Sequence, residues 1–197
     1  SWAVIGTLQE MLSVGPDDWQ TIDDLRRLAE PLQPMTLACA TDGNHGRAVA
    51  RMAAWLGFSS IVLVPEDMAA ARIEAIRGEG AEVRVIDGTY DDAVDASAGL
   101  ASERCLVISD TAWPGYEDVP RRVIEGYSTI LAEVDEQLGG DHVDLVAVPI
   151  GVGALAAAVV GRMRSASRDR QSLILGVEPV LAAVRAEAFH VAAAQVS

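Results

Sequence analysis

The side chains best suited to chemistry lie in one octapeptide, Cys-Ala-Thr-Asp-Gly-Asn-His-Gly at positions 39–46. Thr41, Asp42, Asn44 and His45 carry hydroxyl, carboxylate, amide and imidazole groups, which exchange protons or form hydrogen bonds. Glycines flank the Asn-His pair, and their missing side chains would let a flat ligand approach the backbone. A helical pattern follows, so its first N–H groups could face an anion. A capped strand-to-helix turn without a catalytic role explains the same residues, and both interpretations stay open here.

A second polar segment ends a later apolar run, at Ser-Asp-Thr-Ala-Trp-Pro-Gly-Tyr, residues 109–116. If this segment and the octapeptide share one rim, Asp42 and Asp110 lie on the same ligand-facing edge. Two carboxylates there could act as general bases on opposite faces of a planar intermediate. The alternative is that Asp110 caps a turn and that Trp113 only packs.

A third segment is rich in glycine and follows the apolar run 145–148. Gly151, Val152, Gly153 and Ala154 precede a helical pattern, and their N–H groups could form an anion nest for a phosphate. The spacing also matches Gly-x-Gly-x-x-Ala, a dinucleotide fingerprint, in which Glu178 would hold a ribose. A plain tight turn is the third interpretation of these glycines.

These segments need elements to position them, and the hydrophobic pattern predicts alternating strands and helices from residue 35 onward. The predicted strands are 35–40, 61–64, 83–86, 105–109, 143–148 and 173–177. The predicted helices are 2–13, 21–30, 44–56, 69–77, 89–103, 120–138 and 154–163. Such alternation is typical of an α/β fold with parallel sheets, in which ligands bind beyond the carboxyl ends of the strands.

The change in element length near residue 118 predicts two open parallel-sheet α/β domains. We expect a small domain over 35–118, and a partial large domain that combines 1–34 with 119–197. We expect the large domain to be incomplete.

Composition narrows the possible partners. The net charge is −14, so phosphate backbones and anionic membranes would be repelled. No apolar run reaches the ~20 residues of a membrane span, and no signal peptide is visible. Cys39 and Cys105 lie in apolar runs and are expected to be reduced core thiols. No His, Cys or Asp spacing predicts a metal site, and a cytoplasmic location fits best.

The three polar segments, in this order, resemble the fold-type II pyridoxal-phosphate enzymes, which include the tryptophan synthase β subunit and the serine and threonine dehydratases. Within that family, residues 40–47 and 110–116 are similar to the diaminopropionate ammonia-lyase branch. Most dehydratases have Ser and Gly ahead of the Asn, whereas this chain has Thr-Asp-Gly. The similarity extends from residue 1 to about residue 180.

The resemblance implies a pyridoxal 5'-phosphate-dependent β-elimination that converts D- and L-2,3-diaminopropionate to pyruvate and ammonia. By that resemblance, Asp42 would take the α-proton of the D-isomer and Asp110 that of the L-isomer. Asn44 would hydrogen-bond the cofactor's phenolic oxygen, and residues 151–154 would hold its phosphate. Thr41 and His45 would contact the substrate carboxylate. The family also implies a homodimer.

One feature departs from the family, because all 15 basic residues are arginine and the Schiff-base lysine is missing. In the family this lysine lies shortly before a segment that resembles Ser1-Trp2-Ala3, so we expect the given chain to start just after it. The alternatives are another fold-type II lyase such as a serine or threonine dehydratase, a Rossmann-type NAD oxidoreductase, and a non-catalytic homologue.

Overall fold

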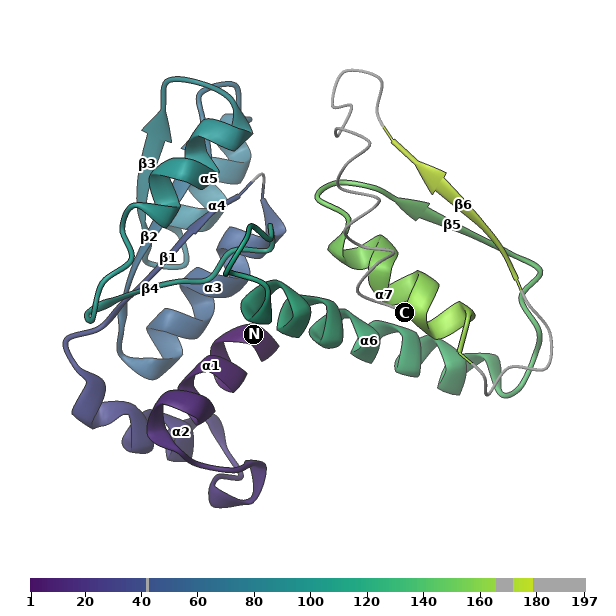
Figure 1. The fold of residues 1–197 in the computed structure, drawn as a ribbon, viewed down its shortest axis with the longest axis horizontal. Helices are drawn as coiled ribbons and strands as arrows, with labels where there is room; N and C mark the ends of the chain where they lie inside the picture. The colour runs from purple at the N-terminus through teal and green to yellow at the C-terminus, as the bar shows by residue number, and fades with distance from the viewer. Residues whose placement is uncertain (42, 166–171, 179–197) are drawn as a thin grey trace. The chain divides into compact units, whose positions relative to one another are not determined.

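The chain divides into two compact units, residues 1–112 and residues 113–197 (Figure 1). The computed structural model describes residues 1–41, 43–165 and 172–178. The predicted α/β class with parallel strands is confirmed. The predicted domain division, in which residues 1–34 join the C-terminal part, stays a prediction.

A four-stranded parallel sheet forms the centre of the N-terminal unit, in the order β3-β2-β1-β4. Its strands are β1 (Thr36–Ala40), β2 (Ser59–Pro65), β3 (Glu82–Ile86) and β4 (Cys105–Val107). The two central strands, β1 and β2, are mainly apolar after the hydroxyl residues Thr36, Ser59 and Ser60 at their starts, and most of their residues are buried. Burial on both faces is what parallel sheets require, because helices cover each side.

The crossover helices take opposite faces of this sheet. They are α3 (Asn44–Leu56), α4 (Ala70–Arg77) and α5 (Tyr90–Ala98). The chain runs from β1 to β2 to β3 in one direction across the sheet and then returns to β4 on the other side of β1. Because crossovers between parallel strands are right-handed, α3 and α4 lie on one face of the sheet and α5 lies on the other. Accordingly α3 contacts α4, and both α3 and α5 pack on β1 and β2.

Two helices precede the sheet and form a layer against α3. The helix α1 (Trp2–Leu12) contacts α2 (Ile22–Ala29), and α2 contacts α3. Short 3₁₀ turns, Pro16–Asp18 and Glu30–Leu32, follow the two helices. Leu8 and Leu25 are fully buried, so this layer adds to the core of the N-terminal unit.

The predicted helix 89–103 is wrong at its C-terminal end. The helix α5 ends at Ala98 and Gly99 caps it. Gly99 is a poor helix former, and Ser102 then pairs with Cys105 in an antiparallel bridge that turns the chain into β4. The predicted strand 105–109 is also too long, since β4 ends at Val107.

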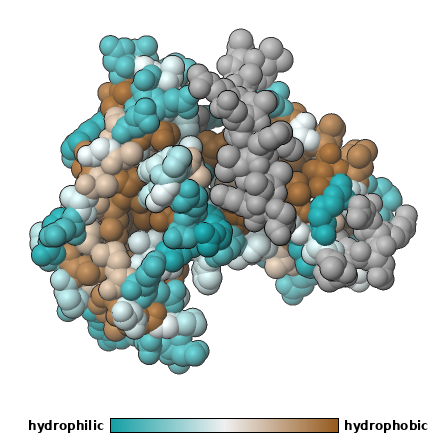
Figure 2. Space-filling view, viewed as in Figure 1, coloured by the Kyte–Doolittle hydropathy of each residue, from teal (hydrophilic) through white to brown (hydrophobic). Residues whose placement is uncertain are grey.

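The C-terminal unit combines a two-stranded sheet with two helices. The helix α6 (Asp118–Leu138) packs on α7 (Ala154–Met163), which packs on β5 (Leu145–Pro149), and β5 pairs in parallel with β6 (Leu173–Val177). Its buried cluster includes Leu131, Val148 and Met163. Several large side chains are exposed on the strands, among them Leu145 at 52% and Leu173 at 66%. Figure 2 shows hydrophobic surface on this unit.

Among the residues that the structure describes, no helix is long and apolar enough to cross a membrane.

A capping box anchors the start of α5. The side chain of Thr89 accepts the N–H of Asp92 at 3.3 Å, and the carboxylate of Asp92 accepts the N–H of Thr89 at 2.7 Å. Both bonds satisfy donors that a helix start leaves unpaired.

We expect Thr89→Ala to lower the free energy of unfolding by about 1 kcal/mol, because the cap oxygen is removed. Urea unfolding would measure this, with Thr89→Ser as the matched variant that keeps the oxygen. Equal losses in both variants would contradict the capping role.

Candidate active site

The carboxyl ends of β1 and β4 meet at one edge of the sheet. The strands pair in parallel with Ala38 opposite Val107, and the N–H of Ile108 donates to the carbonyl of Ala38 at 2.7 Å. The octapeptide continues from β1 and the segment 109–112 continues from β4. The two polar segments therefore share a rim, as the sequence predicts.

The hydroxyl of Thr41 organises the turn of the octapeptide. Its Oγ1 accepts the N–H groups of Gly43 and Gly46, each at 3.0 Å. The N–H of Thr41 itself donates to the carbonyl of Leu63 at 3.0 Å, and the residue is 2% exposed. The turn is therefore held from inside. Its neighbour Asp42 lies outside the described residues.

Gly46 is required at its position by packing. A Cβ there would lie 2.4 Å from Cγ2 of Thr41 and 2.9 Å from Cγ1 of Val62. These distances are far below van der Waals contact, so a larger residue would displace the first turn of α3 from the sheet.

His45, on the first turn of α3, lies between the backbone of one strand end and the side chain of Asp110. Its Nε2 is 2.6 Å from the carbonyl oxygen of Ile108. Because a carbonyl only accepts, Nε2 must carry the proton. Its Nδ1 lies 3.9 Å from Oδ2 of Asp110, and both side chains are 12% exposed. The structure thus brings together two residues that the sequence proposes for the site.

Tyr90 completes the surroundings of Asp110. The hydroxyl of Tyr90 donates to Oδ1 of Asp110 at 3.1 Å and lies 3.4 Å from Oγ1 of Thr111. The N–H of Thr111 in turn donates to the hydroxyl of Ser109 at 3.1 Å. Sequence reasoning missed Tyr90. A signal was available, because Tyr90 follows β3 and begins α5 at the same edge of the sheet.

Cys39 lies beneath this group on β1 and is fully buried. Burial raises the pKa of the Cys39 thiol, and the negative charge of Asp110 raises it further. The thiol is therefore protonated and unreactive, in agreement with the expected core role.

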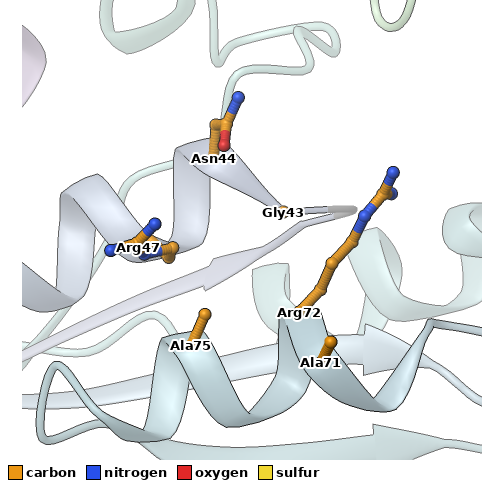
Figure 3. A pocket seen from close by; sticks show the side chains of 6 residues that line it. All are labelled: Gly43, Asn44, Arg47, Ala71, Arg72 and Ala75. Atoms are coloured by element: carbon orange, nitrogen blue, oxygen red, sulfur yellow. The ribbon is translucent and has the colours of Figure 1, made fainter.

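A cavity of about 330 Å³ opens at the N-terminus of α3 (Figure 3). It is lined by Gly43, Asn44, Arg47, Ala71, Arg72 and Ala75. Asn44 is exposed at the top of α3, so its amide is available to a ligand. The charged residues of the lining are arginines, although the chain as a whole is strongly acidic.

One of these arginines is held by a carboxylate. Glu79 accepts hydrogen bonds from Arg47 at 2.9 Å and from Arg51 at 2.7 Å. Hydrogen bonds from Arg51 and then Arg47 lower the pKa of Glu79 to about 2. These contacts of Glu79 with Arg47 and Arg51 connect α3 to the turn after α4, beside the cavity.

The glycine segment of the C-terminal unit has the form of a backbone anion site. Gly153 precedes α7 with φ of 96°, a conformation that favours glycine. No side chain caps the start of α7. A Cβ at Gly151 would meet nothing within 4 Å, so the approach to the backbone is open. N–H groups at the start of a helix suit a phosphate, and residues 151–154 fit that role.

Three further predictions concern Trp113, Glu178 and the absence of a metal site. Trp113 and Tyr116 form a tight turn with their rings stacked at 4.0 Å between centroids. Glu178 is exposed directly after β6. Within the described part of the chain, no group of His, Cys, Asp or Glu could hold a metal ion.

A polar rim beyond the strand ends of a parallel sheet and a glycine-rich helix start are features of many cofactor-binding α/β proteins. Residues 20–196 match the sequence model of the pyridoxal-phosphate-dependent enzymes. The chain belongs to this family, whose cofactor is pyridoxal phosphate.

Individual relatives narrow the comparison. The chain is 36% identical over 156 residues to the diaminopropionate ammonia-lyase of Salmonella typhimurium, covering 77% of this chain and 39% of that protein. The crystal structure of the apo form of Escherichia coli diaminopropionate ammonia-lyase superposes with a TM-score of 0.81 at 33% identity, covering 90% of this chain and 49% of that one. The biosynthetic L-threonine dehydratase of Salmonella typhimurium is 33% identical over 132 residues, covering 67% of this chain and 24% of that protein.

The chain thus spans 39% of the length of the first of these relatives.

We expect Gly46→Ala to lower the free energy of unfolding by about 1–3 kcal/mol, because its methyl group overpacks against Thr41 and Val62. Chemical denaturation would measure the loss. Gly99→Ala is the matched control, since its Cβ would meet only ordinary contacts at 3.5 Å or more. Unchanged stability in Gly46→Ala would contradict the packing argument.

The lowered pKa of Glu79 predicts a pH dependence of stability. The folded pKa of about 2 lies below the ordinary value of 4.5, so the pairing stabilises the fold above pH 4.5 and is lost as the pH falls toward 2. Unfolding measured from pH 5 to pH 2 should therefore show a shallower loss of stability in Glu79→Gln than in the unmodified chain. Identical slopes would show that the Arg47 and Arg51 pairing contributes nothing.

Proposed function

We propose that the protein carrying this chain is an ammonia-lyase that acts on 2,3-diaminopropionate. One diaminopropionate and one water would give pyruvate and two molecules of ammonia. The observation that carries the proposal is Asp110, a carboxylate held at the rim of the sheet beside His45 and Tyr90 in a member of the pyridoxal-phosphate-dependent family. Asp110 is 12% exposed, so it can still reach a ligand.

The choice of this lyase over a dehydratase depends on the octapeptide and on the relatives. The chain has Thr-Asp-Gly ahead of Asn44, where dehydratases have Ser and Gly. The similarity to a diaminopropionate ammonia-lyase extends over 156 residues, against 132 for the threonine dehydratase. Both points support a substrate with an amino leaving group.

The cofactor would be held by two separate groups of residues. The open backbone of residues 151–154, with Gly153 in a left-handed conformation, would bind the phosphate. The exposed amide of Asn44 would hydrogen-bond the phenolic oxygen. Bound pyridoxal phosphate would accept the electron pair left when the α-proton is removed. A phosphate site at residues 151–154 also accounts for the glycines without the dinucleotide interpretation.

The carboxylate of Asp110 would take the α-proton of the L-isomer, and Asp42 would take that of the D-isomer. A carboxylate acts as a general base when it lies within hydrogen-bond reach of the proton. An acid on each face of the substrate would explain the use of both enantiomers.

Thr41 and His45 were predicted to contact the substrate carboxylate. The oxygen of Thr41 accepts two N–H groups of the turn, and a hydroxyl that accepts can still donate its own O–H. We retain the contact as part of the proposal, with the hydroxyl of Thr41 as the donor.

The amine that carries the cofactor is not among these 197 residues, because they contain no lysine. Experiments on activity therefore need the whole gene product that carries this chain. A homodimeric state and a cytoplasmic location stay predictions.

We expect Asp110→Asn to lower kcat for L-diaminopropionate by about 100-fold or more, with the D-isomer little affected, because the loss of a general base costs about 10²–10⁴-fold. Asp42→Asn should show the reverse. Pyruvate release from each pure enantiomer would measure both.

One control variant and two further substrates make this experiment decisive. Asp87→Asn is the matched control, since it removes a carboxylate that has no proposed role. Equal losses of both enantiomers in either test variant would overturn the two-base assignment. Faster pyruvate or ketobutyrate release from L-serine or L-threonine would favour a dehydratase.

A further inference from the structure

The two oxygens of Asp110 have different neighbours, and these come from opposite faces of the sheet. Tyr90 begins α5 on one face and donates its hydroxyl to Oδ1 at 3.1 Å. His45 lies on α3 at the other face, with Nδ1 at 3.9 Å from Oδ2. The carboxylate is thus bounded on both sides, and only one of its oxygens has a direct hydrogen bond from these two residues.

The position of Tyr90 is itself well determined. It follows Thr89, whose capping box with Asp92 anchors the first turn of α5. The hydroxyl of Tyr90 also lies 3.4 Å from Oγ1 of Thr111, so it spans two consecutive residues of the strand end. The backbone of Tyr90 is held by the helix start and its hydroxyl by the strand end. The side chain can therefore orient the Asp110 carboxylate with little further loss of conformational entropy.

The tautomer of His45 determines what faces the other oxygen. The proton on Nε2 is engaged by the carbonyl of Ile108 at 2.6 Å, so neutral His45 presents the lone pair of Nδ1 toward Oδ2. Because the lone pair of Nδ1 carries no proton, it cannot donate a hydrogen bond to the ionised carboxylate. The 3.9 Å between Nδ1 and Oδ2 is longer than a hydrogen bond, so Nδ1 can accept one from a protonated Oδ2 only after the two groups move closer.

We propose that Tyr90 is the positioning residue of Asp110, holding Oδ1 so that Oδ2, beside Nδ1 of His45, is the oxygen that exchanges the α-proton. This inference rests on the proposed function. In the step, the proton passes from the α-carbon to Oδ2, and the electron pair stays with the substrate and its cofactor. The lone pair of Nδ1 then faces the protonated Oδ2 and would accept a hydrogen bond from it once the 3.9 Å separation closes.

The proposal makes Tyr90 specific for one enantiomer, because Asp110 serves the L-isomer. In the whole gene product, we expect Tyr90→Phe to lower kcat for L-diaminopropionate by about tenfold, as the loss of a hydrogen bond to a charged group allows. Its KM for the L-isomer and its kcat for the D-isomer should change less than about twofold. Tyr127→Phe on α6 is the matched control and should leave both rates unchanged.

A purely structural role of Tyr90 would lower both rates together, and that result would overturn the proposal. Unchanged L-activity would overturn it equally.

Two measurements test the contacts of Asp110 with Tyr90 and His45 without an activity assay. In urea unfolding, the losses caused by Tyr90→Phe and Asp110→Asn should be less than additive in the double variant, because the two groups share one hydrogen bond. Long-range ¹H–¹⁵N spectra should assign His45 to the Nε2–H tautomer, and assignment is practical because the chain has only 3 histidines.

These readouts separate the two proposals. Additive losses, or an Nδ1–H tautomer, would overturn the positioning role whatever the substrate is. Non-additive losses in a protein that releases pyruvate from neither enantiomer would instead overturn the proposed function and leave the Tyr90 contact standing.

Discussion

The parallel pairing of β1 with β4 is the constraint on which the site depends. These strands are far apart along the chain, yet Ile108 donates to Ala38 and so continues the ladder to the very edge of the sheet. Asp110 follows two residues later, which puts its carboxylate within 3.9 Å of His45. A shift of one residue in this register would move the segment that carries Asp110 along β1 and separate its carboxylate from His45.

The rim is built so that its polar groups are held by neighbours from several elements. Thr41 gathers the N–H groups of the octapeptide turn, and Gly46 lets that turn approach the strand closely. Asp110 is reached by Tyr90 from α5 and by His45 from α3. Because each contact comes from a different element, the arrangement is preorganised by the fold and does not depend on one loop.

The C-terminal unit contrasts with this arrangement. Its sheet has two strands in the described residues, and side chains such as Leu173 and Leu175 are half exposed or more. Two-stranded sheets need further packing to be stable. Its glycine segment is nevertheless well formed, since β5 and α7 pack together and Gly153 adopts the left-handed conformation between them. The local strand-turn-helix unit therefore suffices to fix the conformation of this glycine turn.

The sequence by itself determined the elements and the family. Apolar runs, glycines and capping residues are local signals, which is why α3, α7 and β6 begin and end where the pattern predicts. The same pattern failed at residues 99–103, where Gly99 and the Ser102–Cys105 bridge overcome a continuing helical pattern. The octapeptide, the segment 109–116 and residues 151–154 carried the resemblance without any structure.

Only the tertiary structure decided which side chains meet. Tyr90 looks like an ordinary helix start in the sequence, and its contact with Asp110 exists because α5 crosses the sheet from β3 to β4. The tautomer of His45 follows from the carbonyl of Ile108, a backbone group that no sequence pattern marks. Contacts of this kind depend on strand order and register, which arise from burial summed over the whole sheet and not from any local run of residues.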